Sequence, residues 1–352
     1  MDSYLDIALK RQAILERLKS GQVRDFAKEI KKIDQLVRVA IGTLEDEFSN
    51  LTRAQLENLI ALLRVDQNKV FAAATQSFLA ETERLAAVYM NQELLDLNNT
   101  VDLRGTKLKS FTNAKLYKNV IQRPMGTNGD LLQPWVKNLT TTEINRVEGA
   151  IRAGHSRGLT NQQMIRSIVG TKSRNFQDGV LQTTRRNAST MVRTSVQHVA
   201  SSARQELWEA NKGVVTRYKF IATLDRKTSK QCRSLDSQEF DFGKGPVPPV
   251  HPNCRSTTIP VLNPKYRFLS TGRTRSAFGG PVSSDTSYYD WLRNQTASTQ
   301  NDVLGKTRAK LFRDSGMSAE KFRALQFDRN FEPLTLKEMQ RIEPQAFKRA
   351  FE

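Results

Sequence analysis

The chain has 352 residues, of which 38% are hydrophobic, and a formal net charge of +19 at neutral pH. It has no run of about 18 apolar residues, so we expect no membrane span. Its first residues lack the basic and apolar segments of a secretory signal, and its two cysteines are too few for a disulfide framework, so we expect synthesis in a reducing cytoplasm.

The positive charge lies almost entirely in the second part of the chain. Residues 1–100 carry 13 basic and 15 acidic side chains, whereas residues 101–352 carry 42 basic and 21 acidic ones. A field of this sign attracts polyanions, and DNA or RNA bound independently of its sequence is the partner we expect. An acidic protein partner, such as a large ring or shell, explains the charge equally well.

Residues 1–98 are expected to form an N-terminal helical region. A helix over residues 4–50 is predicted by an apolar stripe with spacings of three and four: Phe26, Ile30, Ile33, Val37 and Ile41. Thr52 and Gln55 have the spacing of a capping box and precede a second helical face that reaches about residue 95. The stripes favour an intramolecular bundle, and a partner-docking arm is the second interpretation.

Residues 99–140 read as a basic, irregular connector. Its lysines and a pair of arginines further along the chain are predicted to contact the phosphates of a nucleic acid: Lys107, Lys109, Lys115, Lys118, Arg185 and Arg186. A solvated basic face is the alternative for each of them.

Residues 141–262 are expected to form the core of the protein. The apolar spacing predicts a long helix over residues 183–211, and alternation around Tyr218 predicts a strand. Phe240 and Phe242 alternate likewise, and residues 257–259 suggest a short return strand. The predicted fold class is therefore mainly α with a small β-containing Cys/His module (α+β), with long N-terminal helices and an extended C-terminal region.

The C-terminal region is expected to be looser. Residues 263–300 read as a flexible linker because they are rich in glycine and serine. The linker carries an aromatic anchor that could dock on the core or on a partner: Tyr288, Tyr289 and Trp291. Residues 301–352 are predicted to form a helical tail.

The scarcest side chains of the chain lie together in one stretch, residues 223–260. Both cysteines, Cys232 and Cys254, lie there with His251, one of three histidines. Thiolate and imidazole are zinc ligands, so these three side chains could hold zinc, with Asp225, Asp236 or a water molecule as the fourth ligand. His155 and His198 are too distant in sequence to be assigned to this site. A metal-free knuckle with buried thiols and a Cys232–Cys254 disulfide are the alternatives.

An enzyme that uses a Cys-His pair is a further alternative for the same residues. Prolines flank His251, and no oxyanion-forming motif accompanies it, so we predict no catalytic residue and a structural role. Asp225, Arg226 and Arg255 are expected to form an ion pair that closes the stretch, because the planar guanidinium of Arg255 suits a carboxylate.

The stretch resembles the signature of the phage head morphogenesis family, the Mu F-like minor head proteins. The matching segments are Asp225-Arg226-Lys227-Thr228, Cys232, Leu235-Asp236 and His251-Pro252-Asn253-Cys254-Arg255. Three departures are Lys227 before the threonine, Ser237 where glycine is common, and Ser256 where another cysteine is frequent. The resemblance extends upstream through Arg193 and Thr194, and more weakly downstream to about residue 340.

The resemblance implies a minor head protein of a tailed bacteriophage. Such a protein enters the procapsid in few copies, contacts the portal protein and the inner capsid surface, and is located in the virion, inside the head near the portal. It would bind the packaged DNA and act in head assembly and genome delivery. A Cys/His-dependent hydrolase or toxin-like enzyme carried in the head, and a non-viral sequence-independent DNA-binding protein, are the alternatives.

Overall fold

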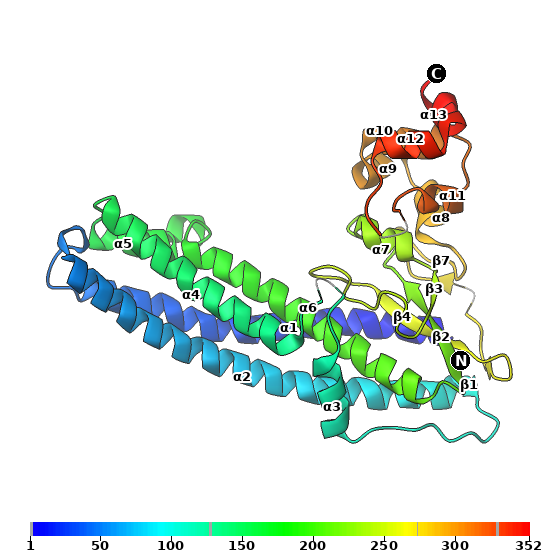
Figure 1. Cartoon of the computed structure of the whole chain (residues 1–352), viewed down its shortest axis with the longest axis horizontal. Helices are drawn as coiled ribbons and strands as arrows, with labels where there is room; N and C mark the ends of the chain where they lie inside the picture. The colour runs from blue at the N-terminus through cyan, green and yellow to red at the C-terminus, as the bar shows by residue number, and fades with distance from the viewer. Residues whose placement is uncertain (1–2, 127–128, 273, 329–330) are drawn as a thin grey trace.

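The computed structural model describes residues 3–126, 129–272, 274–328 and 331–352. It confirms the predicted fold class, because long helices dominate and the strands form small antiparallel sheets. Figure 1 shows an elongated helical bundle, a small sheet near one end of it, and a C-terminal lobe that projects from the sheet. None of the described helices combines the length and apolar character that crossing a bilayer requires.

Two very long helices make up the N-terminal region. Helix α1 spans Tyr4–Gly42 and α2 spans Arg53–Thr100, with the short 3-10 helix η1 (Phe48–Asn50) between them. The predicted capping box begins α2, where the Thr52 side chain accepts from the Gln55 amide. Every member of the predicted stripe is buried: Phe26, Ile30, Ile33, Val37 and Ile41.

These helices share one core with the middle of the chain. Helices α4 (Leu132–Ser156), α5 (Asn161–Val169) and α6 (Val180–Ala210) complete the bundle. Helix α6 packs against both α1 and α2 and is buried along most of its length. One hydrophobic cluster runs through all of these elements. The intramolecular interpretation of the N-terminal stripes is therefore correct, and partner docking can involve only their outer faces.

The prediction of an irregular connector over residues 99–140 is wrong in part. This segment contains α3 (Asn113–Gln122) and the beginning of α4. The 3-10 helix η2 (Lys172–Arg174) lies outside this segment, between α5 and α6. Leu116 and Val120 of α3 are fully buried. The helix was not predicted because its amphipathic pattern is only ten residues long and is interrupted by lysines.

The predicted β-module is a three-stranded antiparallel sheet. Strand β2 (Val215–Ile221) lies between β3 (Glu239–Asp241) and β4 (Thr257–Leu262). The short helix α7 (Lys230–Leu235) connects β2 to β3. A separate two-stranded pair joins β1 (Val101–Asp102) to β5 (Arg267–Phe268).

The C-terminal lobe has a hydrophobic core of its own. It contains a pair of short strands and six short helices: β6 (Thr274–Arg275), β7 (Val282–Ser283), α8 (Tyr288–Arg293), α9 (Ala297–Leu304), α10 (Lys306–Asp314), α11 (Ala319–Ala324), α12 (Leu336–Ile342) and α13 (Pro344–Phe351). Residues 263–300 therefore hold packed elements, and the prediction of a simple flexible linker is wrong. Tyr288, Tyr289 and Trp291 are at most 1% exposed within this core, so their side chains pack inside the protein and offer no exposed surface to a partner.

A buried ion pair joins the lobe to the sheet. Asp236 accepts one hydrogen bond from each of two guanidinium nitrogens of Arg275, both at 3.1 Å, and each residue is 1% exposed. Asp236 also accepts the backbone amides of Ala222 and Tyr288, both at 2.7 Å. This one carboxylate therefore connects the end of β2 with β6 and the first turn of α8.

We predict that Asp236→Asn destabilises the protein by about 3–5 kcal/mol, because it leaves the Arg275 charge buried without a counterion. Glu57→Gln is the matched control, since its partner Arg152 and Glu57 itself are both about half exposed. The control is expected to lose much less stability, because water screens an exposed ion pair. Urea unfolding followed by circular dichroism measures both, and similar losses in the two variants contradict the role assigned to Asp236.

Candidate metal centre and signature turn

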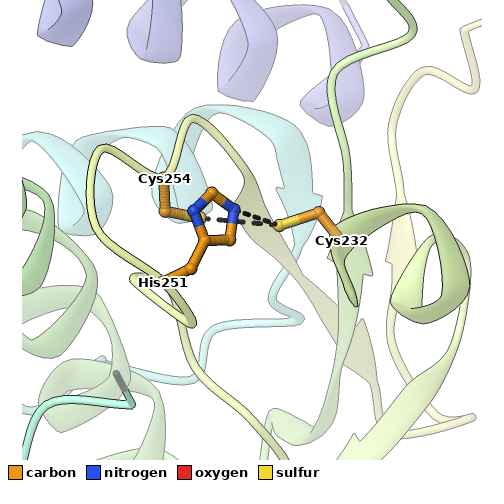
Figure 2. Close-up of side chains that lie close together, drawn as sticks. All are labelled: Cys232, His251 and Cys254. Carbon is orange, nitrogen blue, oxygen red and sulfur yellow. Dashed lines mark hydrogen bonds between the residues drawn. The ribbon is translucent and has the colours of Figure 1, made fainter. Parts of the chain in front are cut away.

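Two local structures bring the scarce side chains together. Cys232 lies in the first turn of α7, where the side chain of the N-cap residue Ser229 accepts from its amide at 3.2 Å. His251 and Cys254 lie at the two ends of a tight turn, closed by the Cys254 amide and the His251 carbonyl at 3.2 Å. Figure 2 shows the three side chains pointing toward one another from these two elements.

The turn explains the order of residues between His251 and Cys254. Proline fixes the backbone angle required at the second position of a type II turn. The third position requires a positive φ, and Asn253 has a φ of 58° there. Asparagine is one of the few residues other than glycine that adopts this conformation readily. Pro252-Asn253 therefore aims His251 and Cys254 at the same point.

The three donor atoms have a spacing suited to a metal ion. The Cys232 sulfur lies 3.1 Å from His251 Nε2 and 3.7 Å from the Cys254 sulfur, and all three donor atoms lie within 4.8 Å of one another. Both cysteines are free thiols, so the disulfide alternative is not present in this structure. His251 Nδ1 lies 2.8 Å from the Pro252 carbonyl, which favours the tautomer with a proton on Nδ1. Nε2 then presents its lone pair to the sulfurs, and the group could hold a metal ion.

The pKa values of the two thiols are shifted in opposite directions. Burial alone raises the pKa of the Cys254 thiol, but the contacts with the Cys232 thiol and the His251 imidazole bring it well below its ordinary value. The bond to Cys254 and burial raise the pKa of the Cys232 thiol well above its ordinary value. Cys254 is therefore the side chain that becomes a thiolate first, and a thiolate is the form that binds metal.

The two carboxylates expected as a fourth ligand are already occupied. Asp225 accepts two hydrogen bonds from the Arg255 guanidinium, at 2.6 and 2.8 Å, and Asp236 forms an ion pair with Arg275. Arg226 is not part of the predicted ion pair: it lies over the Phe278 ring at 4.9 Å and 3.9 Å from Asp302. Within the described residues, only Cys232, His251 and Cys254 form a group of three or more potential metal ligands.

Buried polar side chains fasten the turn to α1 and α6. The Asn253 amide donates to Thr194 Oγ1 at 3.1 Å, and the Lys19 ammonium donates to the Cys254 carbonyl at 3.0 Å. Gln197 donates to the Ser256 carbonyl at 3.2 Å, and Arg204 donates to Thr257 Oγ1 at 2.8 Å. The acceptor Thr194 was expected from the resemblance, whereas the three donors Lys19, Gln197 and Arg204 were missed.

A sequence signal for Lys19 exists. It lies four residues after the buried Leu15 and seven before the buried Phe26, so this cation falls on the apolar stripe of α1. A charged side chain on such a stripe requires a buried partner. Burial lowers its pKa, and the Glu16 carboxylate, at 2.5 Å, opposes that effect.

The other expected signature residues stabilise the same region. Thr228 donates to the Thr223 carbonyl at 2.5 Å and to Asp225 at 3.1 Å, and Leu235 is buried beside Cys232. Arg193 lies 3.5 Å from Glu16 on α1. These contacts are structural.

The remaining histidines lie away from the site. His155 Nε2 lies 2.9 Å from the Leu51 carbonyl. His198 is buried on α6, and burial lowers its pKa to about 4. Neither can supply the fourth ligand.

The residues predicted to contact nucleic acid do not form one surface. Arg185 is paired with Asp34 at 2.6 Å, whereas Arg186 is exposed. Lys107 and Lys109 lie near Asn211, at the other end of α6 from Arg186. The 25 residues between Arg186 and Asn211 correspond to about 38 Å of helix. Lys115 and Lys118 are exposed on α3.

We predict that Thr194→Val costs about 1–3 kcal/mol of folding stability, because the swap keeps the side-chain shape but removes the partner of the Asn253 amide. Thr190→Val on the same helix is the control, since Thr190 accepts only the exposed side-chain amide of Asn253, at 3.3 Å. We expect the control to change stability by at most about 0.5 kcal/mol. Thermal unfolding of the two variants measures the difference, and equal melting temperatures would show that α6 does not hold the turn.

Comparison with known proteins agrees with the geometry of the site. No curated protein and no solved structure matches the chain. Residues 145–259 match the model of the family described as phage Mu protein F like protein. The match includes Arg193, Thr194 and the whole signature from Asp225 to Arg255, whereas the weaker downstream resemblance lies outside it. Residues 145–259 of the chain are therefore similar to the phage Mu protein F-like family.

Proposed function

We propose that this protein is a minor head protein of a tailed bacteriophage, located inside the head at the portal vertex and acting in head assembly and genome delivery. The observation that carries the proposal is the family match over residues 145–259, within which Cys232, Leu235 and Cys254 of the signature pack into one buried cluster. We assign the packaged DNA, the portal protein and the inner capsid surface as its partners.

The charge supports contact with DNA. The 42 basic and 21 acidic side chains after residue 100 give the region a field that attracts a polyanion independently of its sequence. A free DNA-binding protein outside a virus would share this charge but has no reason to carry the signature.

The burial of the thiols favours a structural role over a Cys-His enzyme. Cys232 is 1% exposed and Cys254 is fully buried, so a substrate cannot approach either sulfur without local opening. The carboxylates nearest to the site are held by arginines, and neither is free to act on His251.

Portal contact is assigned to the outer faces of α1 and α2. Isolated apolar side chains such as Ile14, Leu62 and Val88 are more than half exposed there. Deleting residues 1–95 would remove a large part of the shared core, so exposed substitutions are the appropriate test of docking.

Quantitative mass spectrometry of purified particles of the phage that encodes this chain tests the head assignment. We expect a few copies in full particles and fewer in particles emptied of DNA, if the protein leaves with the genome. Absence from both kinds of particle contradicts the proposal, whereas equal amounts in both contradict only the ejection step.

We further propose that the metal is zinc, held by Cys232, His251 and Cys254, with a water molecule as the fourth ligand. Zinc–sulfur bonds of about 2.3 Å place two sulfurs on a tetrahedral ion about 3.8 Å apart. The observed separation of 3.7 Å is close to this value. A bound ion would cross-link α7 to the turn, which is the chemistry that a structural zinc supplies.

The full chain is therefore expected to bind about one zinc per molecule, measured by plasma mass spectrometry after dialysis. Cys254→Ser should lose the metal, and a chelator should lower the melting temperature of the wild type but not of Cys232→Ser. His155→Gln is the control and should retain zinc, because its imidazole contacts the Leu51 carbonyl and the Phe48 ring, which do not belong to the site. A folded wild type without zinc, or a Cys254→Ser variant that keeps it, contradicts the assignment.

A further inference from the structure

Three segments that are distant in sequence meet at the end of the bundle where α6 finishes. Strand β1 pairs with β5, which aligns Asp102 with Arg267. The Thr106 hydroxyl lies 3.0 Å from the Tyr266 hydroxyl. The Lys109 backbone exchanges two hydrogen bonds with the Asn211 side chain, at 2.8 and 2.9 Å. Figure 1 shows β1, the loop that follows it and the end of α6 at this same end of the molecule.

These contacts gather exposed cations, which we call the basic end surface: Arg104, Lys107, Lys109, Lys212, Lys265 and Arg267. The segments 101–109, 211–213 and 263–269 contain a single carboxylate, Asp102, which lies 3.5 Å from Arg267. The other five cations form no ion pair with any carboxylate in the described part of the chain. The basic end surface therefore has a net positive charge that the protein itself does not neutralise.

A neighbouring phenol responds to this field. The hydrogen bond to Thr106 lowers the pKa of Tyr266, and the charges of Lys265 and Arg104 lower it further. Lys265 also lies 5.0 Å from the Tyr266 ring. Tyr266 thus connects the cations of two segments, since Thr106 lies between Arg104 and Lys107.

We propose that the basic end surface is where this protein contacts the sugar-phosphate backbone of double-stranded DNA, an inference that rests on the proposed function. Four of its six cations are lysines, which bind phosphates as point charges on flexible stems. Lysine is depleted at protein–protein interfaces, so a protein partner is the less suitable occupant. The duplex offers one negative charge for about every 1.7 Å of its axis, which lets cations from separate segments bind it together.

This surface differs from the one expected from sequence. Lys107 and Lys109 belong to both sets, whereas Lys212, Lys265, Arg104 and Arg267 become candidates only because the fold brings them together. Arg186 lies at the opposite end of α6, and Arg185 is engaged by Asp34.

The test compares two variants of the full chain that remove equal charge. The surface variant carries R104Q, K107Q, K212Q and K265Q, none of which breaks an ion pair among the described residues. The control carries K28Q, K32Q, K69Q and R84Q on α1 and α2, where each side chain is more than half exposed. Fluorescence anisotropy of a labelled 30-base-pair duplex is measured over a range of salt concentrations, and circular dichroism checks that each variant is folded.

We expect the surface variant to bind the duplex at least about tenfold more weakly at 0.1 M salt, with a log–log salt slope reduced by about three to four. The control is expected to change the slope by at most about one. Equal losses in both variants, or an unchanged slope in the surface variant, overturn the surface while leaving DNA binding intact. A wild type that does not bind the duplex overturns the DNA part of the proposed function as well. A surface variant that binds DNA normally but fails to enter heads assigns these cations to a protein partner and also overturns the proposal.

Discussion

The structure depends on how the closing turn of the signature is held against the middle of α1 and the middle of α6. The turn has little regular secondary structure, and its backbone groups would be costly to bury without partners. Thr194 accepts the Asn253 amide, and Lys19 donates to the Cys254 carbonyl. Because these partners come from α6 and α1, the turn can form in this position only when both helices are packed.

The signature has two sides: one brings together the potential metal ligands, and the other contacts the C-terminal lobe. On one face, α7 and the turn bring Cys232, His251 and Cys254 within reach of a single ion. On the other, Asp225 and Asp236 each bind an arginine, and both contact Tyr288 of the lobe. The same short stretch therefore joins the bundle, the sheet and the C-terminal lobe. Its polar side chains form the hydrogen bonds and ion pairs that make these connections.

Local patterns predicted the parts of the fold that local physics decides. The apolar spacing of Phe26 to Ile41 predicted a buried stripe of α1, and alternation around Tyr218 predicted β2. The proximity of Cys232 to His251 and Cys254 was also predicted, because a proline-rich turn and scarce residue types coincide there. The stripe and the alternation each repeat within a few residues, so tertiary contacts did not override them. Cys232 is 19 positions from His251, and that contact was expected only because both lie in the one stretch that holds the scarce residue types.

Contacts between distant residues were not predictable in this way. Arg275 and Asp236 are 39 positions apart, and nothing in either segment marks the other as its partner. Tyr288, Tyr289 and Trp291 occupy a helix of six residues, too short for a period that would show which side is buried. Lys19 falls on the apolar stripe of α1, but that position does not show that its partner is the Cys254 carbonyl, 235 positions away.

Hydrogen–deuterium exchange of the full chain, read on a peptide covering residues 250–256, tests most directly whether the turn is held by α1 and α6. The account predicts that the Asn253 and Cys254 amides exchange as slowly as those in the middle of α6, although the turn is neither helix nor strand. Exchange at the rate of an exposed loop, with α6 still protected, would contradict the account, because the turn would then open independently of the bundle.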